Sequence, residues 1–369
     1  DNPDLKAFLA IGGWIEGSVK YSDMVSDPQS RAKFIQSAVS FINTYKFDGL
    51  DLDWEYPANR GGVPGDKENF ASLITELREE FEKHGLLLTA AIGTGPSVLE
   101  TAYDFSIMCR DLDFINLMMY DLQGSWDNVT GHHTSLYTHP NLGNISNSLD
   151  NSFELIKSLG GCPGKMVLGM AMYAKTYQLT DPSLTDIGSP TSGDGEMGPY
   201  TKQKGMLGYN ELCLVLDTYE VDQDSYTMAP WAYSGDQWMC YDDVESIETK
   251  SNWALENGLL GGMIWSMETD DFLGKCNDGR YPLLRQIYLT MTTFDTTTQM
   301  SSTGNPYSTE EPQTSDTTVK AADTTFDAPI SSTSLPITPV SDRIIVCYYG
   351  SWATYRPDDG KFDIKDIDT

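Results

Sequence analysis

Short apolar runs alternate with amphipathic stretches from residue 5 to about residue 290. The apolar runs are nearly continuous and do not alternate with polar residues, which indicates strands that are buried on both faces. We predict strands over six ranges, which are 6–12, 47–55, 86–92, 114–120, 166–173 and 259–267.

The amphipathic stretches between these strands predict helices. Asp27 followed by Pro28 is typical of a helix start, because aspartate caps free backbone N–H groups and proline fits the first helical position. The residues that follow place Phe34, Ala38 and Phe41 on one face of that helix. Further helices are predicted over 67–83, 104–111, 148–159, 243–257 and 281–291.

This alternation of strands and helices predicts an α/β fold, in which helices cover a parallel sheet. The six strands are fewer than the eight of a closed barrel, but more than a small two-layer domain contains. Residues 175–240 interrupt the rhythm and are rich in Gly, Tyr, Asp and Met. We therefore predict a small subdomain inserted there between two strand-helix units.

The composition changes sharply over 295–342, where about half of the residues are Thr, Ser or Pro. Too few apolar residues remain to bury a core, so we predict a linker of the kind that is O-glycosylated outside the cell. Residues 343–349 are again typical of a strand. A strand that follows a linker indicates the beginning of a second folded unit.

Acidic residues dominate the charge of the chain, with 54 Asp and Glu against 24 Lys and Arg and a formal net charge of −30. Phosphate backbones and anionic membrane surfaces repel such a chain, so we expect neither nucleic acid nor membrane as a partner. A neutral substrate is compatible with this charge. The longest apolar stretch, 259–267, contains two glycines and is too short to cross a bilayer.

The six cysteines include no CxxC pair and have no histidine at metal-ligand spacing. We therefore predict buried thiols with one or two disulfides rather than a zinc site. Two glycosylation sequons, at Asn128 and Asn144, favour an extracellular setting. For the adjacent pair His132 and His133 we expect surface or hydrogen-bonding roles rather than catalysis.

The segment 47–57 carries the candidate chemistry. Side chains alternate between the two faces of a strand, so Asp51, Asp53 and Glu55 project from one face. Three neighbouring carboxylates repel one another, and some of them must hold or share protons. Glu55 is last in the row, nearest the carboxyl end of the strand, where barrel enzymes place their chemistry. Neighbouring negative charge raises the pKa of Glu55, as a general acid near neutrality requires.

A calcium site also gathers acidic oxygens and is the alternative interpretation of this row. A strand holds its side chains too rigidly and too nearly in line to wrap around an ion, so we favour catalysis. The sequence contains no nucleotide, flavin or metal motif, and we expect no cofactor and no metal.

The acidic pattern Asp48-x-x-Asp51-x-Asp53-x-Glu55 resembles the signature of glycoside hydrolase family 18, which contains the chitinases and their lectin-like relatives. Four further strings resemble the family's motifs for its third, sixth, seventh and eighth strands, namely AIGGW (10–14), NLMMYD (116–121), GMAMY (169–173) and GMIW (262–265). The resemblance extends over residues 1 to about 290. It implies a TIM (β/α)8 barrel, in which residues 175–240 form the α+β insertion that walls the substrate groove.

The resemblance also implies that the barrel is incomplete. The family's barrel begins with two strands before the AIGGW motif, and neither precedes Asp1, whereas residues 343–356 resemble the family's first strand. We therefore expect a fragment of a multidomain, arthropod-type chitinase. It would contain strands three to eight of a catalytic barrel over 1–294, the linker over 295–342, and the start of a second such domain over 343–369. Alternatively, the last strand fills the first position of its own barrel.

Substrate-assisted hydrolysis is the mechanism that the resemblance implies. Glu55 would protonate the glycosidic oxygen, while the substrate's own N-acetyl oxygen attacks the anomeric carbon and forms an oxazolinium ion, so that configuration is retained. Asp53 would orient the acetamido group, and Asp51 would hold Asp53 through a shared proton. Tyr120 would hydrogen-bond the acetamido oxygen, assisted by Asp121.

The same resemblance assigns further residues to substrate binding. Trp265 would form an apolar floor under the sugar. Lys175 stands where the family usually has arginine, and it keeps the charge but loses the planar two-pronged donor. The remaining groove-lining contacts would be Met118, Tyr173, Trp14 and Met263. A disulfide between Cys213 and Cys276 is implied as well, since they match a pair that is commonly bridged in the family.

The resemblance therefore implies a secreted, endo-acting, retaining chitinase that cuts β-1,4-linked N-acetylglucosamine polymers. Its partners would be chitin or N-acetylglucosamine oligomers, with no obligate protein partner. The alternative is a chitinase-like lectin that binds carbohydrate without turnover, although such relatives usually lose the acid that Glu55 provides here. Cleavage of N-glycan cores is a third possibility, against which the groove-walling insertion argues.

Overall fold

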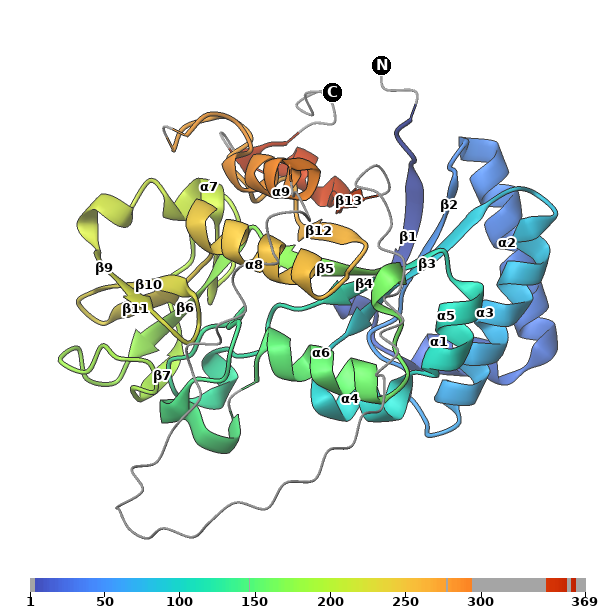
Figure 1. Cartoon of the computed structure of the whole chain (residues 1–369), viewed down its shortest axis with the longest axis horizontal. Helices are drawn as coiled ribbons and strands as arrows, with labels where there is room; N and C mark the ends of the chain where they lie inside the picture. The colour runs from blue at the N-terminus through green and yellow to red at the C-terminus, as the bar shows by residue number, and fades with distance from the viewer. Residues whose placement is uncertain (1–3, 146, 277, 294–342, 357–359, 363–369) are drawn as a thin grey trace, which may run out of the picture.

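A curled parallel sheet of seven strands, β1-β2-β3-β4-β5-β12-β13 in spatial order, forms the centre of the molecule (Figure 1). The computed structural model describes residues 4–145, 147–276, 278–293, 343–356 and 360–362. The strands are β1 (Phe8–Gly12), β2 (Gly49–Asp53), β3 (Leu87–Gly93), β4 (Phe114–Met118), β5 (Met166–Ala171), β12 (Gly261–Trp265) and β13 (Ile344–Cys347). The predicted fold class, an incomplete (β/α)8 barrel with an inserted subdomain, is confirmed.

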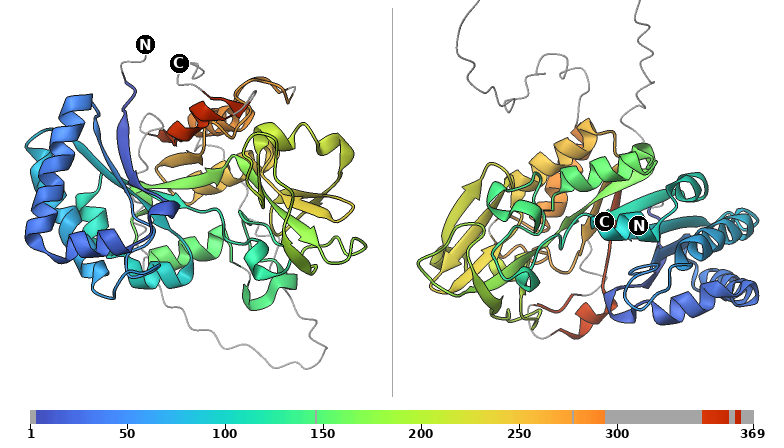
Figure 2. Two further views of the ribbon diagram at one scale, coloured as in Figure 1. Left: turned by 180° about the vertical axis from the view of Figure 1, so that it is seen from behind. Right: turned by 90° about the horizontal axis from the view of Figure 1, so that it is seen from below.

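Helices cover the outer face of this sheet (Figures 1 and 2). The Asp27 carboxylate accepts a hydrogen bond of 2.8 Å from the Ser30 backbone N–H, and Pro28 takes the first helical position, as the sequence predicts. The helices are α1 (Val19–Ser26), α2 (Pro28–Tyr45), α3 (Asp66–Glu82), α4 (Pro96–Ala102), α5 (Phe105–Asp111), α6 (Leu149–Ser158), α8 (Val244–Glu256) and α9 (Pro282–Thr293).

The two faces of the sheet bury different kinds of side chain. Leu50, Leu52 and Trp54 lie in the large core between the sheet and the helices, where the Trp54 ring meets the edge of Phe70 at 5.6 Å between ring centres. A smaller cluster, which includes Ala91, Met118, Val167 and Met263, lies apart from that core. Strand pleating therefore separates the apolar side chains next to Asp51 and Asp53 from the acids themselves.

The insertion is an antiparallel sheet in the order β7-β6-β11-β10-β9, with β8 paired to β6. Its first strand, β6, begins at Tyr173. The predicted strand 166–173 therefore ends two residues too late, because β5 ends at Ala171 and Tyr173 already belongs to the second sheet. Figure 2 shows the insertion beside the half of the barrel that contains β5 and β12. Its elements are β6 (Tyr173–Leu179), β7 (Thr191–Asp194), β8 (Met206–Gly208), α7 (Tyr209–Leu212), β9 (Glu220–Asp224), β10 (Ala229–Ser234) and β11 (Gln237–Cys240).

The strand β13 is part of the central parallel sheet, at its edge beside β12. It pairs in parallel with β12, with Gly261 opposite Ile344 and Ile264 opposite Cys347. The path of the described sheet therefore ends at β1 on one side and at β13 on the other. The predicted linker over 295–342 lies outside the described residues. No helix in the described part of the chain is both long enough and apolar enough to cross a membrane.

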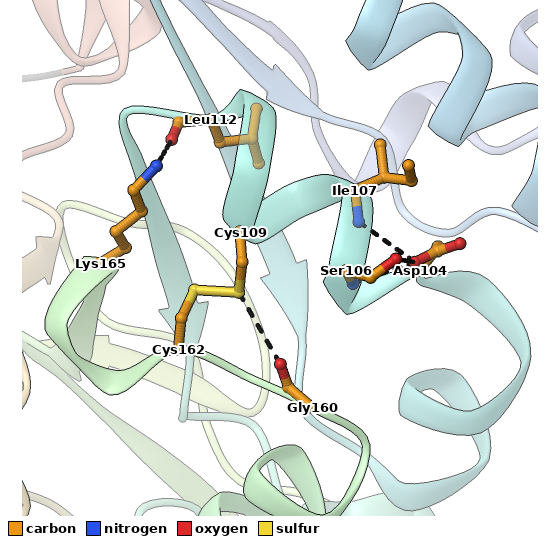
Figure 3. The surroundings of a disulfide bond; sticks show 8 residues. All are labelled: Asp104, Ser106, Ile107, Cys109, Leu112, Gly160, Cys162 and Lys165. Atoms are coloured by element: carbon orange, nitrogen blue, oxygen red, sulfur yellow. Dashed lines mark hydrogen bonds between the residues drawn. A yellow bond between two sulfur atoms is a disulfide. The ribbon is translucent and has the colours of Figure 1, made fainter.

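Two disulfides tie loops of this fold together. Cys213 is bonded to Cys276, the pair that the resemblance implies. The second bond, between Cys109 at the end of α5 and Cys162 before β5, could not be assigned from the sequence (Figure 3). Lys165, three residues after Cys162, donates to the Leu112 carbonyl at 2.8 Å, so the two segments are joined by a hydrogen bond as well.

Candidate functional site

The predicted row of acids lies at the carboxyl end of β2. Asp51, Asp53 and Glu55 are 3%, 6% and 9% exposed, so all three carboxyl groups are largely removed from water. Burial disfavours a charged carboxylate, and three such groups in one place also repel one another. The pKa values of all three acids are accordingly raised above their ordinary values, in each case mainly by burial.

Asp51 is the most completely hydrogen-bonded of the three. Its Oδ1 accepts from the Thr89 hydroxyl at 2.6 Å and from the Asn116 side-chain amide at 3.1 Å. Its Oδ2 accepts from the Tyr348 hydroxyl at 2.5 Å. These donors oppose the effect of burial on the pKa of Asp51, because they stabilise its charged form. Negative charge in the row is therefore best accommodated on Asp51.

Asp53 lies between the other two acids and is less well satisfied. Burial raises its pKa well above the ordinary value, and the charges of Glu55 and Asp51 raise it further. Its Oδ1 is buried and has no hydrogen-bond partner among the described residues. An unpaired buried oxygen costs free energy, which a bound ligand can recover by supplying a donor.

Glycines at the end of β1 allow the chain to pass close to Asp53. Gly12 has a φ of +129°, and a Cβ atom placed there would lie only 1.9 Å from the Asp53 carbonyl oxygen. The next residue, Gly13, donates its backbone N–H to that same oxygen at 2.7 Å. Only glycine fits at position 12, which gives the AIGGW string a physical reason.

Glu55 lies two residues beyond the end of β2. Burial raises its pKa, a hydrogen bond with Tyr56 and the positive charge of Arg60 oppose that change, and the charge of Asp121 adds to it. The Arg60 side chain donates through Nη1 to the Glu55 backbone carbonyl at 3.0 Å. The side chain of Glu55 therefore holds its proton to a higher pH than an exposed glutamic acid.

Asp121 anchors the wall that follows β4. Its Oδ1 accepts from the Tyr173 hydroxyl at 2.7 Å and lies 3.4 Å from His133 Nδ1, and its Oδ2 lies 3.1 Å from Lys175 Nζ. Burial alone would raise the pKa of Asp121, but these three neighbours lower it well below its usual range. Asp121 is therefore ionised, and its side chain keeps 43% of its surface exposed.

Tyr120 is the neighbour of Asp121 on the same wall. Burial, followed by the charges of Asp53 and Asp121, raises the pKa of its phenol well above the usual value, so it remains a hydrogen-bond donor. Its hydroxyl lies 3.9 Å from the sulfur of Met263. Met263 is fully buried and Met118 nearly so, which puts both beneath the polar groups of the site.

Aromatic rings surround these polar groups. Trp265 is partly exposed, and its ring centre lies 5.5 Å from that of Tyr348. Trp14 and Trp126 are 60% and 58% exposed. Lys175 Nζ lies 5.5 Å from the centre of the Trp126 ring, so Trp126 belongs to the wall around Asp121. Partly exposed tryptophans around a polar centre are typical of carbohydrate sites, because the ring faces are apolar and flat.

Several of these residues were not assigned from the sequence. His133 is fully buried against Asp121, and its Nε2 has no partner among the described residues. Trp126 lies in the short helix η2 (Ser125–Asp127). In the sequence, only its position in a polar loop could have indicated a binding role. Arg60 and Tyr348 contact the acidic row from segments whose approach only the folded chain reveals.

The two predicted glycosylation sites are described to different extents. Asn128 is exposed and ends η2 in a left-handed conformation, with a φ of 58°. The side chain of Asn144 is not among those that the structure describes. Within the described part of the chain, no group of three or more His, Cys, Asp or Glu residues is arranged so that it could hold a metal ion.

The fold and this acidic centre define a member of a known family. Residues 1–270 match the sequence model of the glycosyl hydrolases family 18, and the chain belongs to that family. It is 39% identical over 296 residues to chitotriosidase-1 of Mus musculus, an alignment that covers 78% of this chain and 63% of that protein. It is 42% identical over 291 residues to probable chitinase 2 of Drosophila melanogaster, covering 74% of this chain and 58% of that protein.

The chain thus spans about three fifths of the length of these two relatives. A third relative, probable chitinase 10 of Drosophila melanogaster, is 33% identical over 401 aligned positions. That alignment covers 99% of this chain but only 18% of the relative.

Solved structures give the same fold. The Group IV chitinase of Ostrinia furnacalis has a TM-score of 0.76 and 40% identity, covering 78% of this chain and 80% of that one, and a second structure of it contains allosamidin. Human YKL-39, described as a pseudo-chitinase with retained chitooligosaccharide binding, has a TM-score of 0.75 and 36% identity, covering 79% and 81%. The family therefore contains both enzymes and proteins that only bind sugar.

Proposed function

We propose that this protein hydrolyses β-1,4-linked N-acetylglucosamine polymers, internally and with retention of configuration. The observation that carries the proposal is the row of three buried acids with raised pKa values, which ends at Glu55. Burying three carboxyl groups side by side opposes stable folding, and a structural role does not require it. A general acid at neutral pH does require a proton held by such an environment.

Glu55 donates its proton to the glycosidic oxygen, and the bond to the anomeric carbon breaks. The acetamido oxygen of the same sugar attacks that carbon from the opposite face, which gives an oxazolinium ion. Glu55, now a carboxylate, takes a proton from the incoming water, whose oxygen bonds to the anomeric carbon and opens the ring. Two inversions at one carbon leave its configuration unchanged.

Asp53 serves the acetamido group. Its Oδ1, which has no hydrogen-bond partner in the part of the chain that the structure describes, accepts a hydrogen bond from the acetamido N–H and thereby turns the carbonyl oxygen towards the anomeric carbon. The positive charge that develops on the oxazolinium ion favours an ionised Asp53. Asp51, with its three donors, can receive the proton that Asp53 gives up. Proton sharing between Asp51 and Asp53 supports a catalytic role for both residues.

Tyr120 donates to the acetamido oxygen, a role that its raised pKa supports. The ionised Asp121, which Tyr173 and Lys175 hold in place, accepts hydrogen bonds from hydroxyl groups of the sugar. Trp265 packs against the apolar face of the ring. These are hydrogen bonds and apolar contacts that require no charge on the ligand, which explains how a chain of net charge −30 binds an uncharged polymer.

Secretion follows from the same proposal, because the substrate is an extracellular polymer. Two disulfides support it, since such bonds persist in oxidising compartments. The exposed sequon at Asn128 is also compatible with passage through the secretory pathway.

The test is the release of a chromophore from a chromogenic N-acetylglucosamine trimer, together with the anomer of the sugar that is freed first. The proposal expects turnover with the β-anomer formed initially, as proton NMR can follow. Formation of the α-anomer would exclude the substrate-assisted route. Tight binding of chitin oligomers with no turnover would favour the chitinase-like lectin, the function that pseudo-chitinase YKL-39 exemplifies.

A further inference from the structure

Trp14 lies at the surface just beyond β1, the strand at which the described sheet ends. It begins η1 (Trp14–Glu16), the short helix that one residue separates from β1, and 60% of its surface faces solvent. The next residue, Ile15, is almost completely exposed. An exposed indole beside a polar site offers a flat apolar face on which a sugar ring can stack.

Arg60 covers the Trp14 ring and reaches the acidic row at the same time. Its guanidinium carbon lies 3.4 Å from the centre of the Trp14 ring, while Nη1 donates to the Glu55 carbonyl oxygen at 3.0 Å. A guanidinium is planar and weakly hydrated, so it can stack on an indole face and still donate from its edge. Stacking on one face leaves the orientation of the indole fixed.

The turn that carries Arg60 is rigid. Asp66 is fully buried and accepts backbone N–H groups from both sides of the turn, Ala58 at 3.1 Å and Val63 at 2.8 Å, through the same oxygen. Its other oxygen accepts from the Ser22 hydroxyl at 2.6 Å. The turn is therefore held from within, and Arg60 starts from a fixed position.

The loop that carries Trp14 is fixed to the same strand end. Ser18 donates its hydroxyl to the Tyr56 carbonyl at 2.9 Å and accepts from Trp54 Nε1 at 3.0 Å. Gly13 donates to the Asp53 carbonyl at 2.7 Å, one residue before Trp14. The indole thus stands on a loop anchored at both ends to the strand that carries the acids.

We propose that Arg60 is a positioning residue that holds the Trp14 ring as a stacking platform for sugar units beyond the one at Asp53 and Glu55. It thereby determines the preference of the site for long oligomers. This inference rests on the proposed function in that it takes the acidic row as the place where one sugar binds. It does not depend on turnover.

The experiment measures binding of chitohexaose and chitobiose by calorimetry to the full chain carrying Glu55→Gln. This background prevents hydrolysis, and it removes the charge of Glu55 on which Arg60 could act. Adding Arg60→Ala should weaken chitohexaose binding about two- to fivefold, with a smaller effect on chitobiose. Arg60→Lys should restore only part of the loss, because lysine keeps the charge but has no planar face.

Two controls make the outcome specific. Arg110→Ala removes another exposed arginine, on α5, that contacts Asp111 and lies outside the site, and it should leave the ratio of the two affinities unchanged. In a Trp14→Ala background, Arg60→Ala should have no further effect on chitohexaose binding. Near-ultraviolet circular dichroism confirms that each variant is folded.

Equal weakening of both oligomers, full restoration by lysine, or an undiminished Arg60 effect without Trp14 would each overturn the inference. A parent protein that binds in the expected pattern but never turns over chitin would refute only the proposed function. The two failures are therefore distinguishable.

Discussion

Tyr348 offers a sharp test of the site, because it joins the acidic row from the far end of the chain. Its hydroxyl donates to Asp51 Oδ2 at 2.5 Å and accepts from the Asn116 amide at 3.0 Å. Tyr348→Phe removes only that oxygen. The ring remains to pack against Trp265, whose centre lies 5.5 Å away.

The magnitude follows from the charge on Asp51. A hydrogen bond to a charged group contributes about 1.5–3 kcal/mol, and its loss leaves a buried donor and a buried acceptor unsatisfied. With one donor gone, the pKa of Asp51 rises further, so Asp51 holds a proton of its own over a wider pH range and is less able to receive the one that Asp53 gives up. If that free energy is lost from the transition state, kcat/KM falls about 10- to 100-fold.

The assay is hydrolysis of a chromogenic chitin oligomer at several substrate concentrations, so that kcat and KM are separated. We expect the loss mainly in kcat, since the ring contact with Trp265 is preserved. Tyr288→Phe on α9 removes an exposed hydroxyl and is the matched control. If Tyr348→Phe changes kcat/KM less than twofold, Tyr348 does not serve Asp51, and the position of β13 beside β12 does not contribute to the site.

Three further predictions concern protonation and stability. Activity requires protonated Glu55, so the alkaline limb of the kcat/KM profile should lie above the ordinary pKa of glutamic acid. The titratable or charged groups that act on Glu55 include Asp53, Tyr56, Arg60, Tyr120 and Asp121. Arg60→Gln should move this limb to higher pH and Asp121→Asn should move it to lower pH, and shifts of the same sign would contradict this prediction. Asp270 is fully buried and burial raises its pKa to about 7, so it destabilises the fold as pH rises from 4 to 7, by up to roughly 4 kcal/mol. Urea unfolding of Asp270→Asn should show a flatter dependence on pH over that range, and an unchanged slope would show that Asp270 ionises normally. Replacing Cys109 and Cys162 together by alanine should lower the free energy of unfolding by ~2–4 kcal/mol, because their bond closes a long loop with a separation of 53 residues; a loss below about 0.5 kcal/mol in urea melts would contradict that contribution.

Local patterns were sufficient to predict much of the fold. The run at 47–55 and the helical spacing over 67–83 correspond to β2 and α3, because burial on a strand or a helix face depends on neighbours in the chain. The strand boundary near Tyr173 was wrong by two residues, since an apolar run does not reveal where a chain leaves one sheet for another. The row of acids was likewise visible, because it lies on one short strand.

Contacts between distant segments were beyond the reach of such patterns. The hydrogen bond from Tyr348 to Asp51 spans 297 positions, and nothing in the local sequence of either residue indicates it. The stacking of Arg60 on Trp14 depends on a turn that Asp66 shapes, and the pairing of Cys109 with Cys162 depends on how α5 meets the loop before β5. Each of these is decided by tertiary geometry rather than by residue type.

Glu55→Gln is the most direct test of the central claim, that a proton held on Glu55 drives hydrolysis. The exchange keeps the size and hydrogen-bonding shape of the side chain but removes the proton that it can give. Turnover of a chitin oligomer should fall by at least about 100-fold, while the affinity for chitohexaose stays within a few-fold of the parent. Glu68→Gln, an exposed position on α3, is the control and should retain full turnover. Turnover that survives Glu55→Gln would contradict the account.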